Sequence, residues 1–199
     1  MLQVSIDSNI DEIEKKLSEI TDRSRLVMMR AMNRTARNIA TTTKREVASR
    51  YFVKQKQVAD TLKISKASKS NLEVAVVSKG EKLELEKFKV SPREPVKIIS
   101  REERTPKVYK AAVKKAGGLK PLYGERASGK QSKPFFATTK KGTQGIFFRS
   151  RAKAYPIKQV MGPAIPQIID NKEIMENIMK KANETLEKRI EHELSRVIK

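Results

Sequence analysis

The stretch that comes nearest to a catalytic motif is residues 124–130, whose order matches the first seven positions of a phosphate-binding P-loop. The eighth position should supply a hydroxyl group to magnesium, but Gln131 stands there. A working P-loop also needs a buried strand before it and a helix N-terminus after it, whereas Pro134 follows closely. We therefore interpret the run as a glycine-bearing loop and predict no nucleotide site.

The only histidine, His192, lies between two glutamates on the polar side of an expected helix. A zinc-protease motif needs a second histidine one turn later, and Arg196 occupies that position. The chain has no cysteine, so neither a thiolate metal site nor a disulfide is available. The sequence predicts a protein that is not an enzyme and holds no metal and no cofactor.

Basic residues are the remaining candidates for function. Residues 89–158 contain 19 Lys and Arg against 4 acidic residues. Such a stretch is either a solvated loop or a surface that contacts nucleic-acid phosphates or acidic neighbouring subunits, and the number of cations favours a contact surface. Aromatic residues are sparse there, with Tyr123 and Tyr155 the rings placed to stack on bases. The expected contact residues are Lys114, Lys115, Lys120, Arg126, Lys130, Lys133, Lys140, Lys141, Arg149, Arg151 and Lys153.

Composition limits the kinds of partner. A net charge of +21 over 199 residues exceeds what solubility requires and implies a polyanionic partner or a strongly acidic protein surface. The first residues lack the features of a signal peptide, and no apolar run approaches the length of a membrane span. We expect one soluble domain, residues 1–199, without membrane contact. Its core should be mainly aliphatic, because Trp is absent and aromatic residues make up 5% of the chain.

Hydrophobic periodicity predicts two long helices, at residues 24–51 and at about residues 170–198, where Asp170 and Glu173 form a capping-box pattern. A further helix after Ser8 and a short one at residues 58–62 are also expected. The expected buried positions of the first long helix are Met28, Met32, Thr35, Ile39, Thr43 and Val47. Those of the second are Met175, Met179, Ala182, Leu186, Ile190 and Leu194.

Alternating apolar residues predict short strands. They lie at residues 2–6, in a hairpin of residues 72–85, at residues 107–113, and in a hairpin of residues 135–148 that turns at Gly142. Prolines predict an extended crossover at residues 156–166, and glycines argue against regular structure between about residues 117 and 133.

Together these elements predict an α+β fold in which two long amphipathic helices pack on a small antiparallel sheet. Residues 89–133 should form a basic extended loop or arm. We expect it to be mobile until it meets an anionic surface, because it offers little apolar area to offset the entropy of ordering.

A resemblance to a known family begins in the first long helix, with the run Met29-Arg30-Ala31-Met32-Asn33-Arg34-Thr35-Ala36. It continues in order through Val53-Lys54, Val58, Leu62-Lys63 and Lys66-Ala67. It resumes at Phe135-Phe136-Ala137, Phe147, Arg149, Tyr155-Pro156-Ile157 and Gly162-Pro163-Ala164-Ile165-Pro166. On these residues the chain resembles the prophage minor tail protein Z family, a group of tail-completion proteins of tailed phages. The resemblance lapses across about residues 89–133.

The resemblance implies a structural protein of the virion, which completes or caps the head-proximal end of the tail tube and helps the tail to join the head. Such subunits are expected to form a ring, hexameric if it matches the tail's symmetry. The implied partners are further copies of the chain, the tail tube, and tail terminator or neck and connector proteins, with packaged DNA as another expected contact. The implied location is the tail of the virion, after assembly in the host cytoplasm.

The alternative from another class is a nucleic-acid-binding protein. It would act through the basic surface and bind the phosphate backbone without reading sequence, because the chain carries no helix-turn-helix, zinc-finger or RNA-recognition signature.

Overall fold

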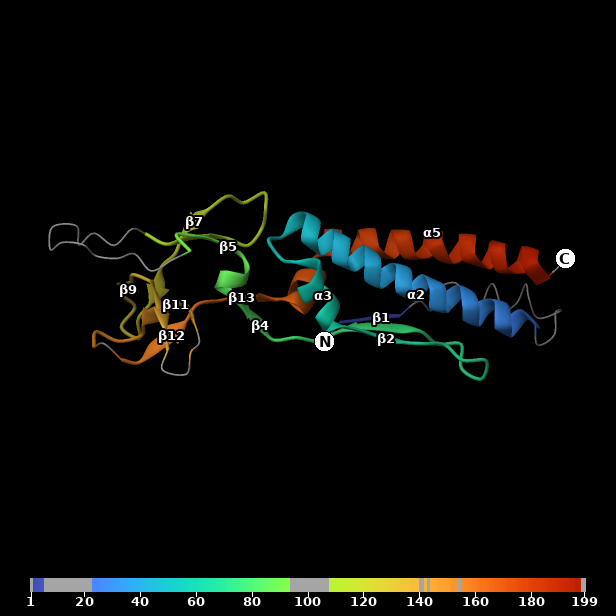
Figure 1. The fold of residues 1–199 in the computed structure, drawn as a ribbon, viewed down its shortest axis with the longest axis horizontal. Helices are drawn as coiled ribbons and strands as arrows, with labels where there is room; N and C mark the ends of the chain where they lie inside the picture. The colour runs from blue at the N-terminus through green and yellow to red at the C-terminus, as the bar shows by residue number, and fades with distance from the viewer. Residues whose placement is uncertain are drawn as a thin grey trace. The chain divides into compact units, whose positions relative to one another are not determined.

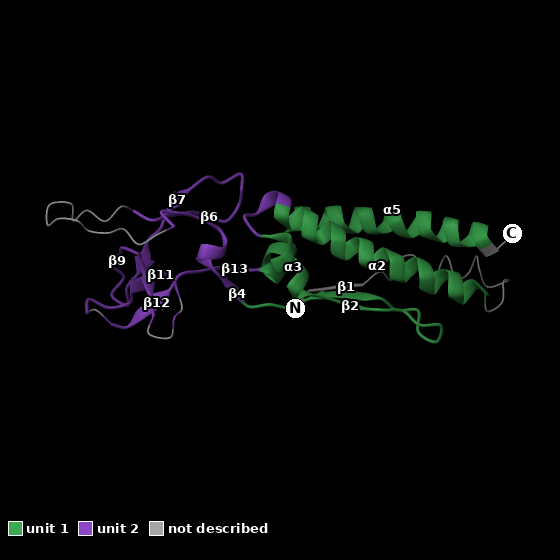
Figure 2. Ribbon diagram, viewed as in Figure 1, with its two compact units in different colours: residues 1–48, 54–81, 165–199 green, residues 49–53, 82–164 purple. Residues whose placement is uncertain are grey.

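The computed structural model describes residues 2–5, 23–93, 108–139, 142, 144–153 and 155–197. These residues form helices and five small antiparallel sheets (Figure 1), so the predicted mixture of helix and antiparallel strand is confirmed. The chain divides into two compact units (Figure 2): unit 1 is residues 1–48, 54–81 and 165–199, and unit 2 is residues 49–53 and 82–164. The expected single domain stays a prediction, because two compact units of one chain can still unfold together.

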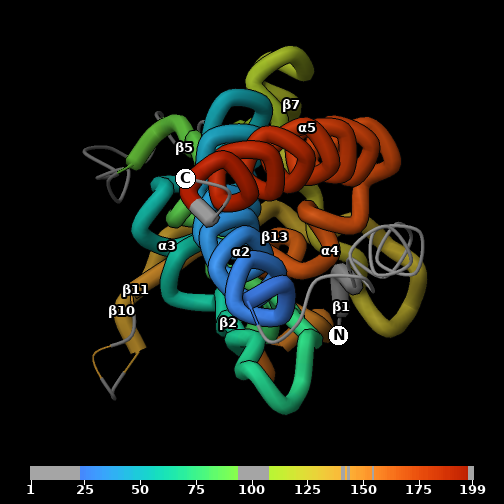
Figure 3. The backbone as a smooth tube through the Cα atoms, turned by 90° about the vertical axis from the view of Figure 1, so that its right-hand side faces the viewer, coloured from blue at the N-terminus to red at the C-terminus, as the bar shows by residue number. Residues whose placement is uncertain are grey.

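Unit 1 is built around the long helix α2 (Arg23–Arg50), which confirms the predicted helix at residues 24–51. All six residues expected on its inner face are buried, and Val27, Ala31, Ala36 and Thr42 are buried as well. At about 100° per residue, these positions cover roughly half of the helix circumference. The buried face is this wide because α2 lies between helix α5 (Lys172–Val197) and a three-stranded sheet (Figures 1 and 3).

The sheet of unit 1 has the order β1-β3-β2, with β1 (Leu2–Ser5), β2 (Leu62–Ser65) and β3 (Ala75–Ser78). The short helix α3 (Gln55–Thr61) leads into β2. Both the first strand and the short helix were expected. The predicted hairpin of residues 72–85 is wrong, because β1 and β2 occupy both edges of β3. The next strand, β4 (Lys82–Glu84), pairs instead with β13 (Met161–Ala164) in unit 2.

Two helices close the chain, α4 (Ile165–Ile169) and α5. The extended crossover expected up to residue 166 is wrong at its end, since Pro166 lies in the first turn of α4, where a missing N–H breaks no helix hydrogen bond. Helix α5 begins one residue too late for Asp170 to be its N-cap, and Asn171 O accepts from Ile174 N–H (2.9 Å).

The buried stripe of α5 also differs from the prediction. Met175, Met179 and Leu194 are half-buried, whereas Ala182, Leu186 and Ile190 are buried as expected. The buried residues of α5 recur at every fourth position, and this spacing includes Ile174 and Ile178 in place of the adjacent Met175 and Met179. The resulting stripe is Ile174, Ile178, Ala182, Leu186 and Ile190.

Unit 2 is made of short strands. Strands β5 (Lys89–Ser91), β6 (Lys110–Ala112) and β7 (Lys120–Pro121) form one sheet, and β8 (Gly124–Glu125) with β9 (Gln131–Ser132) forms another. Strands β10 (Phe135–Thr138), β11 (Gln144–Arg149) and β12 (Ile157–Gln159) form a third sheet. Strands β4 and β13 form the fourth, and the 3-10 turn η1 (Leu85–Lys87) follows β4.

Two sequence predictions in unit 2 are confirmed. Phe135 lies opposite Phe147 in the β10–β11 hairpin, and Gly142 at its turn has a φ of 80°. Strand β6 lies within the strand predicted at residues 107–113.

The basic arm expected at residues 89–133 needs correction, because strands β5 to β9 lie within it. Gly118 and Gly129 adopt φ values of 62° and 74°, so the glycines allow turns between strands of two or three residues where the sequence suggested no regular structure. The mobility of the arm stays a prediction. Residues 94–107 of the arm and the helix expected after Ser8 lie outside the described residues.

Candidate functional site

The predicted contact residues gather in unit 2. Nine of the eleven are described and all nine belong to that unit, while Lys140 and Lys141 lie outside the described residues. Over its whole sequence, unit 2 holds 22 Lys and Arg against 6 acidic residues, a net charge of +16. Unit 1 holds 22 against 17, a net charge of +5. The charge imbalance is therefore a property of one unit of the fold.

One part of this basic surface is held by the chain that follows α2. Tyr51 forms an antiparallel bridge with Lys114, and the Lys115 N–H donates to Arg50 O at 2.9 Å. Lys114 Nζ lies 5.8 Å from the centroid of the Tyr51 ring, where the electron-rich face attracts an ammonium group. Because Tyr51 is buried and Lys114 is exposed, the ring fixes a cation that faces solvent.

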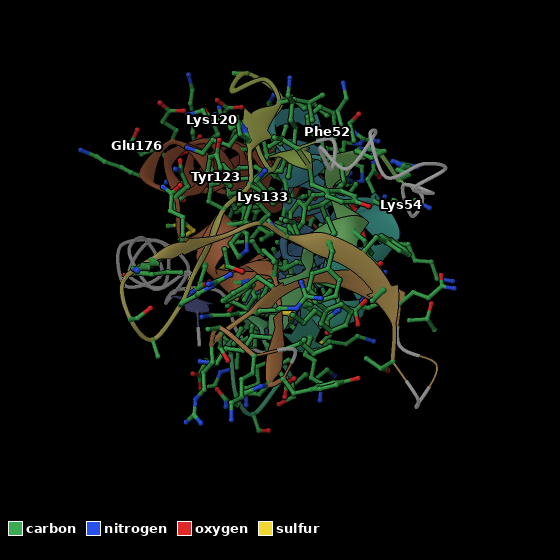
Figure 4. The ribbon with its side chains drawn as sticks, turned by 90° about the vertical axis from the view of Figure 1, so that its left-hand side faces the viewer. Phe52, Lys54, Lys120, Tyr123, Lys133 and Glu176 are labelled. Carbon is green, nitrogen blue, oxygen red and sulfur yellow. The ribbon has the colours of Figure 1, made fainter. Side chains whose placement is uncertain are left out.

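Lys120, Tyr123 and Lys133 belong to the short strands and turns that lead from β7 to β10 (Figure 4). Lys120 is exposed and pairs through its backbone with Ala111 of β6. Tyr123 is 56% exposed and Tyr155 is 72% exposed, so both rings that the sequence offered for stacking reach solvent.

Ser150 assembles a second part of the basic surface. Its carbonyl accepts a hydrogen bond from Ala127 N–H (2.9 Å), and its own N–H and hydroxyl donate to Pro156 O (3.1 and 2.9 Å). Ala127 lies in the loop between β8 and β9, so this loop is tied to the turn that follows β11. The tie brings together cations that are distant in the sequence, namely Arg126, Lys130, Arg149, Arg151 and Lys153.

Two arginines in this group have defined surroundings. The Arg149 guanidinium carbon lies 4.8 Å from the centroid of the Phe135 ring, within reach of a cation–π contact. Arg126 is half-buried, and its Nε–H has no acceptor among the described residues.

Acidic residues do little to offset these cations. The described carboxylates of unit 2 are Glu84, Glu86 and Glu125, and Glu84 pairs with Lys87 at 3.5 Å. Burial raises the pKa of Glu86 above its ordinary value of 4.5, the Glu84 carboxylate raises it further, and Lys87 lowers it. The described part of unit 2 thus contains few carboxylates that could neutralise the predicted surface.

Residues 124–130 form part of the β8–β9 hairpin, in which Arg126 N–H donates to Lys130 O at 3.0 Å. This strand–loop–strand geometry differs from the strand–loop–helix arrangement that a P-loop requires. His192 is exposed on α5, as predicted. Among the described residues, no group of three or more His, Asp or Glu could hold a metal ion, and no helix is long and apolar enough to span a membrane.

Comparison with known proteins identifies the kind of chain. The family model for prophage minor tail protein Z (GPZ) matches residues 9–199. The chain belongs to this family. The match includes residues 89–133, over which the sequence alone showed no resemblance. No curated protein and no solved structure matches the chain.

Membership of the minor tail protein Z family indicates a structural role in a phage tail, and hence a place in the virion. Two residues that carry the family resemblance join distant segments of the chain. Asn33 Nδ2 donates to Ala67 O (3.0 Å), and Asn33 Oδ1 accepts from Ala67 N–H (2.9 Å), so two segments of the resemblance fix each other. Asn33 and Ala67 therefore have a structural role in the fold, whereas Arg149 belongs both to the family resemblance and to the basic surface of unit 2.

Sequence reasoning missed the residues that position the cations, chiefly Tyr51 and Ser150. Their contacts join segments far apart in the chain, and neither residue type signals such a role. The one available signal for the Asn33–Ala67 pair was that both residues belong to the family resemblance.

Proposed function

We propose that this chain completes the head-proximal end of a phage tail tube and helps the tail to join the head. Family membership over residues 9–199 supports a tail role, and the net charge of +16 in unit 2 is the observation that carries the finer assignment. A protein at the junction of tail and head meets acidic protein rims and packaged DNA, and a densely cationic surface fits both.

Of these two partners, the acidic rim of the tail tube, tail terminator or connector is the one we propose for the basic surface. The described cations do not follow a groove of stacked aromatic rings, as expected for a protein that tracks single strands, and family membership argues for protein neighbours. Phosphate contacts stay the second candidate, since a dense set of cations attracts the phosphate backbone without regard to sequence.

Ring formation is part of the proposal. Subunits that each carry +21 repel one another, and this repulsion is strongest where salt is low and the screening length is long. We expect the free chain to be a monomer or small oligomer that closes into a hexameric ring only on a tail. Light scattering of the purified chain at low ionic strength tests this point, and a stable free ring would contradict it.

The decisive experiment removes four exposed charges from unit 2 and asks whether tails still join heads. The variant carries glutamine at Lys120, Lys130, Lys133 and Arg151. The matched control carries glutamine at four exposed lysines of unit 1, namely Lys56, Lys63, Lys66 and Lys69. The unit 2 variant is expected to give tails that lack heads in electron micrographs, while the control supports joining. Equal joining by both variants would refute a role for the basic surface.

DNA binding by the same proteins separates the two partners. If phosphates are the partner, affinity should fall by roughly 0.9 log units per log unit of salt for each phosphate contacted, and it should not depend on sequence. If an acidic rim is the partner, binding to DNA is weak for the unchanged chain and the joining defect appears all the same. Strong, salt-sensitive binding that disappears in the unit 2 variant would favour the nucleic-acid-binding alternative.

A further inference from the structure

The outer face of α2 carries a row of arginines. We define the basic ridge as Arg30, Arg34, Arg37 and Arg45, all of which are exposed. Their steps of four, three and eight residues keep them on one side of the helix, and Thr41 occupies the position that completes the row. The side chains point away from the ten buried positions of α2. The ridge spans sixteen residues, and its two ends are about 22 Å apart along the helix.

The outer face of α5 carries a row of glutamates. We define the acidic ridge as Glu176, Glu184, Glu187 and Glu191, which are likewise exposed, with Lys180 completing the row. At about 100° per residue, this row lies opposite the buried stripe of Ile174 to Ile190. It also spans sixteen residues, with its ends about 22 Å apart, so the two ridges have the same length.

The ridges do not neutralise each other within one chain. Helices α2 and α5 lie side by side and antiparallel in unit 1 (Figures 1 and 3), and the contacts between them include the ion pairs Arg30–Glu193 (3.7 Å) and Glu46–Lys181 (2.6 Å). Neither carboxylate belongs to the acidic ridge. Among the described residues, no ion pair joins Arg34, Arg37 or Arg45 to a glutamate of α5.

The spacing of the two rows matches in one direction only. Read backwards, the basic row steps by four, four, three and four residues, and the acidic row read forwards takes the same steps. An antiparallel alignment places Lys180 opposite Thr41, the one position of the basic row without a charge. A parallel alignment places Lys180 opposite Arg34 and sets two cations against each other. The antiparallel register sets the four arginines opposite glutamates in the pairs Arg45–Glu176, Arg37–Glu184, Arg34–Glu187 and Arg30–Glu191.

We propose that the basic ridge of one copy docks antiparallel on the acidic ridge of the next copy. The two ridges are different surfaces of one chain, so the contact is head-to-tail, and repeated contacts of this type close into a ring when the rotation permits. The inference rests on the ring in the proposed function and assigns its subunit interface to unit 1. Exposed ion pairs are individually weak, but several in register fix partner and orientation.

Charge reversal tests the interface. One variant carries Arg34→Glu and Arg37→Glu, and a second carries Glu184→Lys and Glu187→Lys. Each alone should lose the concentration-dependent self-association of the unchanged chain in analytical ultracentrifugation near physiological salt, because the two central pairs of the register, 34–187 and 37–184, then set like charges against each other. An equal mixture should associate again, since the basic ridge of the first variant and the acidic ridge of the second then set opposite charges against each other at all four pairs.

Matched controls reverse two exposed charges elsewhere in unit 1. Lys63→Glu with Lys66→Glu changes the net charge as the first variant does, and Asp60→Lys with Glu73→Lys changes it as the second does. Both controls should associate like the unchanged chain. The interface is refuted if the controls lose association equally, if the mixture of ridge variants stays dissociated, or if the unchanged chain is monomeric at every concentration. It is also refuted if only the basic-ridge variant is affected and the lost activity is DNA binding.

Head joining gives an independent readout. If each single-ridge variant still joins tails to heads, the interface is wrong and the proposed function stands. If the ridges behave as expected in solution but the unchanged chain does not restore joining to tails that lack it, the proposed function is wrong and the interface stands.

Discussion

The two units of this protein build their cores from different side chains. All six Phe and all four Tyr belong to unit 2, whereas the buried apolar residues of unit 1 are aliphatic residues and methionine. Unit 1 contains the helices α2 and α5, of 28 and 26 residues, while the strands of unit 2 have two to six residues. A long helix is held by its own backbone hydrogen bonds and can bury many small aliphatic side chains along one face. Short strands have few backbone hydrogen bonds each, so their packing depends more on a few large aromatic rings.

The two units also differ in their charge. Unit 1 is nearly balanced, and it sorts opposite charges onto two helix faces. Unit 2 has a large excess of cations, and most of its described lysines and arginines lie on short strands and turns. The proposals therefore divide the contacts: copies of the chain meet through unit 1, and an anionic partner meets unit 2.

Because the aromatic residues belong to unit 2, near-ultraviolet circular dichroism reports on that unit alone. Far-ultraviolet dichroism is dominated by the helices, which belong almost entirely to unit 1. The two signals can therefore follow the units separately in each of the following variants.

The largest effect is expected for Ile39→Asp in α2. Ile39 is 2% exposed, and a buried carboxylate without a partner should cost several kcal/mol, a large share of a typical stability of roughly 5–15 kcal/mol. We expect the helical far-ultraviolet signal to be lost. Asn38→Asp is the matched control, because Asn38 is exposed on the same helix and its carboxylate analogue can still accept the Thr42 hydroxyl. His192→Ala should preserve both folding and tail assembly.

The near-ultraviolet signal of the Ile39→Asp variant tests whether the two units fold together. If that signal is lost with the helices, the units fold as one body. If it persists, unit 2 is independent and the single-domain prediction is wrong. A fully helical Ile39→Asp protein would show that the inner face of α2 is misassigned.

A smaller effect is expected for Gly124→Ala in unit 2. A Cβ atom added at Gly124 would lie 2.3 Å from Phe148 Cγ, so the β8 backbone and the ring must separate. Overpacking of this kind costs roughly 1–3 kcal/mol. We expect a lower midpoint of thermal unfolding and an altered near-ultraviolet signal. Gly117→Ala is the control, because its added Cβ would lie 3.8 Å from the nearest atom, and an equal loss in both variants would contradict the packing argument.

The smallest effect is expected for Glu86→Gln in η1. The raised pKa of Glu86 means that the folded state disfavours its ionised form, chiefly through burial and then through Glu84. Its contribution to stability is thus present below the unfolded pKa of about 4.5 and is lost as the pH rises through the higher folded value. Glutamine should stabilise the protein slightly at neutral pH and make no difference in acid. Melting curves at both pH values check this sign, and a destabilised variant at neutral pH would reverse it.

The sequence by itself determined the features that depend on neighbouring residues. The inner face of α2, the β10–β11 hairpin at Gly142 and the concentration of cations in residues 89–158 all follow from local periodicity, turn chemistry or residue counts. The family resemblance in residues 29–36 could also be read directly, because these residues are consecutive in the sequence.

Only the tertiary structure decided which distant segments meet. Strand β3 pairs with β1 and β2 and not with the neighbouring β4, Ser150 joins two cationic turns, and Ile174 and Ile178 are buried in preference to Met175 and Met179. Strand partners compete for the same edges, and several apolar side chains can fill one position. Local propensity does not rank such alternatives, because their free energies depend on contacts with residues remote in the sequence.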